Sequence, residues 1–139
     1  MSFVLDSSLS LAWCFEDEQT LSVMALLDRI TETGATAPLL WPLEVLNALF
    51  AAERRRRIDG ARRRRLATFL RDLPIALDGD TAARAWKPTA GLAERFGLTT
   101  YDAAYLELAH RRRLPLASLD QALCAAATAM GVDTLGAVA

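Results

Sequence analysis

Residues 98–123 decide the fold, and they read LTTYDAAYLELAHRRRLPLASLDQAL. Helical periodicity covers residues 101–113, and Thr99 and Thr100 before it suit the start of a helix. Residues 114–117 are a short apolar run, and helical periodicity returns at residues 119–130, with Ser118 as the expected N-cap. A helix, a short buried strand and a second helix in succession are typical of layered α/β domains.

The same alternation extends over the rest of the chain. Apolar runs at residues 2–5, 36–38 and 74–77 predict three more strands, and residues 131–134 could hold a short edge strand. Helices are expected at about residues 9–33, 41–57, 61–72 and 81–96, with a break near 16–18 and a kink at Pro88. We therefore predict an α/β fold: one domain, residues 1–139, with a Rossmann-like parallel β-sheet flanked by helices on both faces.

Composition excludes several classes of protein. A chain of 139 residues with 53% hydrophobic and 24% charged residues is not intrinsically disordered. Two cysteines cannot form a disulfide framework or a thiolate zinc site, and one histidine excludes a histidine-rich metal site. Neither a signal peptide nor an apolar stretch long enough to span a membrane is visible. We therefore expect a cytoplasmic protein with no membrane partner.

The net charge of −1 hides a strong asymmetry. Residues 54–71 contain nine arginines and one acid, whereas the rest of the chain has seven basic and sixteen acidic residues. Arginine binds phosphate through a planar fork of N–H groups, so a nucleic-acid contact is one interpretation. Contact with a protein partner and two solvated helix ends are the other interpretations. The candidate phosphate contacts are residues 54–57, 62–65 and 111–113.

Acidic residues stand where predicted strands or loops lead into helices. Asp6 follows the first strand, and Asp102 and Asp120 lie near the starts of two later helices. Each has an ordinary explanation, because the helix dipole favours aspartate in a first turn. However, parallel sheets bind their ligands beyond the carboxyl ends of the strands, where these residues are expected.

Glu44 is harder to explain structurally. Eight of the ten residues 43–52 are apolar, and only Glu44 and Asn47 are polar. Such a helix is expected to be buried all round, so the carboxylate must either pair with an arginine or face a polar site. We favour the polar site.

Convergence of these four carboxylates would require cations. Two carboxylates about 5 Å apart repel by roughly 3 kcal/mol at an effective dielectric constant of 20. A site made only of oxygen ligands favours Mg²⁺ or Mn²⁺ over zinc. Metal-dependent phosphodiester hydrolysis is the chemistry that uses such a site.

The motifs resemble those of the PIN-domain ribonucleases, most closely the VapC-like toxins of bacterial type II toxin–antitoxin pairs. The matching stretches are residues 4–8 (VLDSS), 41–49 (WPLEVLNAL), 97–109 (GLTTYDAAYLELA) and 114–123 (LPLASLDQAL). A further acid often found just after the fourth aspartate is absent, with Gln121 nearby, which puts a second metal ion in doubt.

The resemblance implies a function and a set of site residues. Asp6 and Asp102 would bind Mg²⁺ or Mn²⁺ directly, Glu44 directly or through water, and Asp120 would complete the set or hold a second ion. Ser118 would be the hydroxyl residue near the site, with Ser7 and Asn47 in support. The implied partners are an RNA substrate, a cognate antitoxin that occludes the site, and a second copy in a homodimer.

Other functions fit less well. A phosphoacceptor receiver domain needs paired acids after the first strand and a lysine after a late strand, but Ser7 and Ser8 follow Asp6 and Lys87 is the only lysine. A haloacid-dehalogenase-type phosphatase needs a second aspartate where Ser8 stands. The remaining alternative is a catalytically weak PIN-like module that binds nucleic acid or protein.

Overall fold

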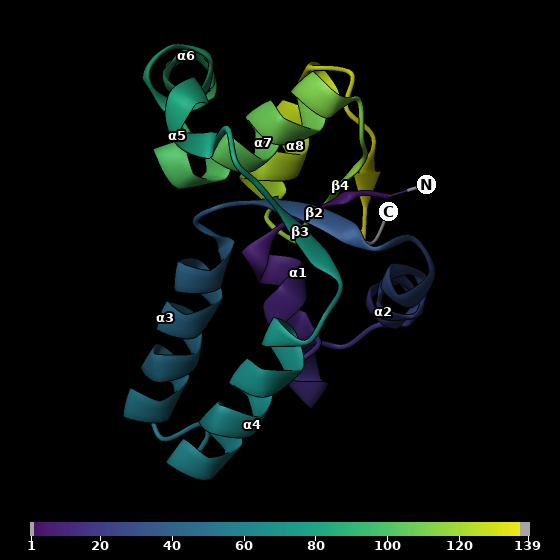
Figure 1. Cartoon of the computed structure of the whole chain (residues 1–139), viewed down its shortest axis with the longest axis vertical. Coiled ribbons are helices and arrows are strands. Elements are labelled where there is room, and N and C mark those ends of the chain that lie inside the picture. The colour runs from purple at the N-terminus through teal and green to yellow at the C-terminus, as the bar shows by residue number, and fades with distance from the viewer. Residues whose placement is uncertain (1, 137–139) are drawn as a thin grey trace.

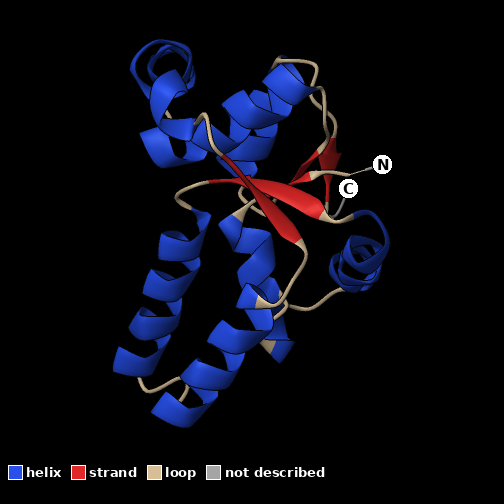
Figure 2. Ribbon diagram, in the orientation of Figure 1, coloured by secondary structure: helices blue, strands red, loops and turns tan. Residues whose placement is uncertain are grey.

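Five short strands pair in parallel in the order β3-β2-β1-β4-β5 (Figures 1 and 2). This computed structural model describes residues 2–136, so both ends of the predicted domain, residue 1 and residues 137–139, lie outside the described residues. The strands are β1 (Val4–Leu5), β2 (Ala35–Pro38), β3 (Ile75–Asp78), β4 (Leu116–Ala117) and β5 (Thr134–Leu135). The sequence located all five to within a few residues.

The central strands are buried on both faces of the sheet. Val4 of β1 pairs with Thr36 of β2 on one side and with Leu116 of β4 on the other, and all three side chains are buried. A strand covered on both faces has no solvent side, so its sequence is a continuous apolar run. This is why such short strands could be recognised from sequence.

Helices cover both faces of the sheet, with α1–α4 on one face and α5–α8 on the other (Figure 1). The first group is α1 (Ser7–Ala12), α2 (Leu21–Thr33), α3 (Trp41–Arg54) and α4 (Gly60–Arg71), with a 3₁₀ turn at Glu16–Glu18. The second is α5 (Thr81–Arg84), a π-helical turn (Ala85–Thr89), α6 (Ala90–Phe96), α7 (Thr100–Arg112) and α8 (Gln121–Ala129). The predicted fold class is confirmed.

Helix α7 is the central helix of its face. Every residue from Ala103 to Ala109 is buried, including Glu107, and the helix contacts β1, β2 and β4. No helix among residues 2–136 is long and apolar enough to cross a membrane.

The prediction that the helix around Glu44 is buried all round was wrong. Leu43 is 73% exposed and Phe50 is 42% exposed on α3. The reason is tertiary: α3 packs against α1 and α4, and these neighbours cover only part of its circumference. Helices α3 and α4 form a hairpin that extends away from the sheet (Figure 1).

Asp6, Thr99 and Asp120 are the N-caps of α1, α7 and α8. Thr99 is one of the two threonines expected at the start of α7, whereas Ser118 was expected to cap α8. Each observed cap accepts a hydrogen bond from a backbone N–H of the first turn. The hydroxyl of Ser118 accepts from the backbone N–H of Asp120, one residue before α8 begins at Gln121, so the first turn of α8 is capped by Asp120.

Candidate active site

The site lies between β1 and β4, the two strands from which the chain continues toward opposite edges of the sheet. Strands β1 and β4 are neighbours, but the chain leaves β1 toward one edge of the sheet and leaves β4 toward the other. In α/β proteins ligands bind at the carboxyl ends of the strands at such a switch point. Asp6 directly follows β1 and Ser118 directly follows β4, so both lie at this position of the sheet.

Asp6 is held by hydrogen bonds from the segments that follow β1 and β4. Its Oδ2 accepts from the hydroxyls of Ser8 at 2.6 Å and Ser118 at 2.7 Å, and its Oδ1 accepts from the backbone N–H of Ser7 at 2.8 Å. These three hydrogen bonds orient the carboxylate of Asp6, which is only 2% exposed. Burial raises the pKa of Asp6, and the charge of Asp120 raises it further.

Ser8 and Ser118 join the two connections into one unit. The Ser8 hydroxyl accepts from the backbone N–H of Leu119 at 3.0 Å, and the Ser118 hydroxyl accepts from that of Asp120 at 3.1 Å. Because both hydroxyls also donate to Asp6, their orientations are determined at both ends. Sequence reasoning missed Ser8, whose signal is a serine two residues after the aspartate.

Glu44 lies in the first turn of α3. Pro42, at the amino end of the same helix, suits a helix start. The hydroxyl of Tyr105 donates to Glu44 Oε1 at 2.6 Å. Burial raises the pKa of Glu44, and the charges of Asp6 and Asp102 add to the effect. Glu44 thus faces a polar site. Tyr105 was missed, although it stands three residues after Asp102 and so on the same side of α7.

Asp102 and Asp120 lie at the amino ends of α7 and α8. Burial raises the pKa of Asp102 to about 6, and the charges of Asp6 and Asp120 contribute. Asp120 Oδ1 accepts from the backbone N–H of Leu123 at 2.9 Å. Helix N-termini favour these negative charges, which offsets part of their mutual repulsion.

The four predicted carboxylates come from four different elements, and their charges act on one another. Asp120 acts on Asp6 and Asp102, and Glu44 is affected by Asp6 and Asp102. Among residues 2–136, none of the four makes an ion pair with arginine, lysine or histidine. We call Asp6, Glu44, Asp102 and Asp120 the acidic site. Asn47, expected in support, is exposed on α3.

The donor set fits a hard divalent cation. All four side chains offer only carboxylate oxygens, and positive charge would relieve their repulsion. Among the described residues, no group of three or more His, Cys, Asp or Glu side chains is arranged so that it could hold a metal ion. Asp6, Glu44 and Asp120 each direct an oxygen to a serine, tyrosine or backbone donor instead. Each carboxylate has about four lone-pair sites, and these hydrogen bonds use only some of them, so the present contacts are compatible with cation binding.

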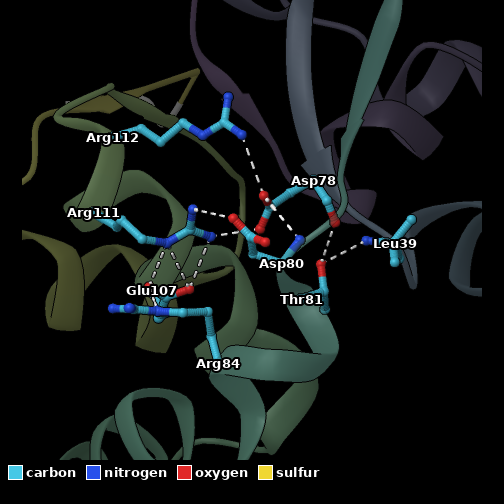
Figure 3. A network of polar contacts seen from close by, with 8 residues as sticks. All are labelled: Leu39, Asp78, Asp80, Thr81, Arg84, Glu107, Arg111 and Arg112. Atoms are coloured by element: carbon cyan, nitrogen blue, oxygen red, sulfur yellow. Dashed lines mark hydrogen bonds and ion pairs between the residues drawn. The ribbon is translucent and has the colours of Figure 1, made fainter.

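A second set of buried carboxylates was not anticipated (Figure 3). Asp78 at the end of β3 and Glu107 on α7 both contact Arg111, and Arg112 and Arg84 contact Asp78 and Glu107 respectively. We call these five residues the paired cluster. Burial acts to raise the pKa of Asp78, but the hydrogen bonds from Arg111 and the Asp80 backbone and the nearby arginine charges lower it below its usual value.

The paired cluster changes the interpretation of the last arginine run. Arg111 and Arg112 were candidate phosphate contacts, but both guanidinium groups bind carboxylates of the protein itself. Arg113 is exposed. The sequence interpretation failed because the partner Asp78 lies more than thirty residues away, on another element.

Comparison with known proteins gives a family and two similar folds. The sequence profile described as PIN domain matches residues 3–129. The crystal structure of PAE2754 from Pyrobaculum aerophilum is similar, with a TM-score of 0.70 and 23% identity over 96% of this chain and 83% of that chain. The crystal structure of FitAcB from Neisseria gonorrhoeae has a TM-score of 0.66 and 16% identity, over 98% and 97%. At these identities the two structures show a shared fold. None of the curated proteins compared matches the chain.

Proposed function

Because the chain belongs to the PIN-domain family, whose members are generally nucleases, we propose that it is a Mg²⁺-dependent endoribonuclease. The observation that carries this proposal is the acidic site: four carboxylates from four elements interact through their charges, and none is paired with a basic residue among residues 2–136. Phosphodiester hydrolysis uses such a site, and Mn²⁺ could replace Mg²⁺.

The roles of the residues follow from their contacts. The chemistry that Mg²⁺ supplies when bound is polarisation of a phosphoryl oxygen and activation of water for attack. We expect Asp6 and Asp102 to bind the ion directly and Glu44 directly or through water, with Asp120 completing the set or holding a second ion. Ser118 and Ser8 position the carboxylate of Asp6, and Tyr105 positions that of Glu44.

We further propose that the protein is the toxin of a type II toxin–antitoxin pair. The support is the resemblance of its motifs to those of VapC-like toxins, in the same order along the chain. On this proposal the protein acts in the cytoplasm, forms a homodimer and is inhibited by a cognate antitoxin that covers the acidic site.

RNA cleavage by purified variants tests the nuclease proposal. Wild-type protein should cleave RNA with Mg²⁺ or Mn²⁺ and lose this activity in a chelator. Asp102→Asn should lose more than the 10- to 100-fold typical of residues that only position a metal ligand. Asp28→Asn, an exposed aspartate on α2, is the matched control and should keep full activity.

Two results would contradict the proposal. Cleavage that persists in the chelator would exclude a metal-dependent nuclease. RNA binding without cleavage under any metal condition would favour the alternative, a catalytically weak binding module. The toxin role is tested separately by inducing the protein in bacteria: growth should stop with the wild type and continue with Asp102→Asn. Co-expression of a small neighbouring reading frame should restore growth if that frame encodes the antitoxin.

A further inference from the structure

The end of the α3–α4 hairpin carries a concentration of positive charge. We call residues 54–65, which run from the end of α3 through the turn into α4, the hairpin tip. It contains eight arginines and a single acid, Asp59. The turn lies at the end of the hairpin that is farthest from the sheet (Figure 1).

Three of these arginines are held by contacts within the protein: two attach the hairpin to the segment at residues 14–18, and one joins α3 to α4. Arg57 pairs with Asp17 and Glu18, and its guanidinium lies 3.9 Å from the centre of the Phe15 ring. Arg62 donates to the carbonyl of Cys14 at 3.5 Å. Arg63 pairs with Glu53 within the hairpin and lies over the ring of Phe50. These contacts account for Arg57, Arg62 and Arg63 structurally.

The other five arginines of the tip have no such explanation. Arg54, Arg55, Arg56, Arg64 and Arg65 are exposed, and none forms an ion pair with another described residue. Arg56 has a φ of 60°, a left-handed conformation that favours glycine or asparagine, so the turn itself gives no reason for arginine there.

We propose that the hairpin tip binds the phosphates of an RNA strand, away from the acidic site. This rests on the proposed function, in which RNA is the substrate. Four carboxylates repel a polyanion, and the chain outside residues 54–71 is strongly acidic. A separate cluster of unpaired guanidinium groups is therefore the surface that attracts RNA to this protein.

The composition of the tip fits RNA better than a protein partner. Stable protein interfaces have an apolar centre. The only large apolar residue in the sequence of the hairpin tip is Ile58, and it is only 6% exposed. Successive helical residues point about 100° apart, so consecutive arginines spread around the helix axis and share no single flat face. A flexible strand can follow such an arrangement, whereas a rigid partner cannot.

The length of α3 sets how far the RNA must extend. Glu44 and Arg54 are ten residues apart on this helix, which corresponds to about 15 Å of rise. A stacked strand advances about 3.4 Å per nucleotide, so the span corresponds to about four or five nucleotides. An RNA that occupies the acidic site must be longer than this before it also contacts the hairpin tip.

Equilibrium RNA binding tests the proposal. Arg54→Gln/Arg64→Gln/Arg65→Gln is compared with the control Arg71→Gln/Lys87→Gln/Arg95→Gln, which removes three exposed charges elsewhere. Both are made in full-length protein carrying Asp102→Asn, so that the RNA is not cut. The probes are labelled uridine oligomers of about 4 and about 16 nucleotides, which bracket the usual range of single-strand sites.

The tip variant should bind the long oligomer about 10- to 100-fold more weakly than its parent. The slope of log affinity against log salt should become shallower by about 2, because each phosphate contact to a single strand contributes about 0.7. The short oligomer offers fewer phosphates to the tip, so its affinity should differ less between parent and tip variant, and the control should retain the parent slope. Unchanged affinity and slope for the long oligomer would overturn the proposal, as would a change only in self-association measured by sedimentation.

The two proposals fail in different ways. A wild-type protein that binds RNA through the tip but never cleaves it would refute the nuclease and leave the tip's role intact. A tip variant, with Asp102 restored, that cleaves long RNA with unchanged KM would refute the tip's role and leave the nuclease intact. If both are correct, this variant shows a raised KM for long RNA and an unchanged kcat.

Discussion

The acidic site and the paired cluster are two groups of buried carboxylates at the same end of the sheet, and their electrostatics are opposite. Asp6, after β1, and Asp78, at the end of β3, are each 2% exposed. Yet the pKa of Asp6 is raised and that of Asp78 is lowered. Burial therefore does not distinguish the two groups. The difference is that Arg111 and Arg112 contact Asp78, whereas the acidic site has no basic residue of its own.

This difference separates a structural role from a functional one. A buried carboxylate with an arginine partner is neutralised by the fold, and its pairing can be explained without a ligand. Burial and neighbouring negative charges raise the pKa of Asp6, Glu44 and Asp102, which is costly to the fold unless something outside the chain supplies positive charge. Carboxylate clusters that lack protein cations are for this reason candidate metal sites.

The largest effect on stability is expected from breaking the paired cluster. Arg111→Gln leaves Asp78 and Glu107 buried with reduced compensation, and removal of one partner of a buried pair costs about 3–5 kcal/mol of unfolding free energy. Urea unfolding should show this loss, and Arg71→Gln, which breaks the exposed pair with Asp72, should show little change. A small loss for Arg111→Gln would mean that the cluster does not hold β3 and α7 together.

A smaller effect, of opposite sign, is expected when cations are added to the acidic site. Mg²⁺ or Mn²⁺ at 100 times its dissociation constant should stabilise the native state by about 2.7 kcal/mol, seen as a rise in Tm. Asp102→Asn should respond far less. Asp28→Asn, remote from the site, should respond as the wild type does. Equal shifts in wild type and Asp102→Asn would show that the ion binds somewhere else.

The smallest effect, and the most specific to the comparison, is the pH dependence of the metal-free protein. Folding raises the pKa of Asp102 from 3.8 to about 6, so between these values the native state holds more protons and stability falls as pH rises. For Asp78 the folded pKa is lowered, so stability is present above 3.8 and is lost as pH falls through the folded value.

Asp102→Asn isolates the first of these contributions. Relative to wild type, the metal-free variant should be more stable near pH 7 than near pH 4, by about 1 kcal/mol because water screens this half-exposed carboxylate. Unfolding free energies of the two proteins at both pH values provide the measurement. A difference that does not change with pH would show that Asp102 is not repelled by its neighbours.

Much of the fold and site could be predicted because the information is local. Parallel strands covered on both faces must be apolar along their whole length, so runs such as residues 2–5 and 114–117 are visible without any tertiary knowledge. A carboxylate directly after such a run lies at the ligand-binding edge of the sheet. Asp6, Glu44, Asp102, Asp120 and Ser118 could be proposed on this basis together with the family resemblance.

What only the tertiary structure decided are the pairings between distant segments. The sequence by itself determined the strands, most helices, the acidic residues at the helix starts and the arginine-rich segment, because each depends on neighbouring residues. It did not show that Arg111 binds Asp78, that Tyr105 donates to Glu44 or that Ser118 donates to Asp6. Each of these hydrogen bonds joins residues that are far apart in the chain, and only the packing of α7 and β4 against their neighbours sets the distances over which charges and hydrogen bonds act.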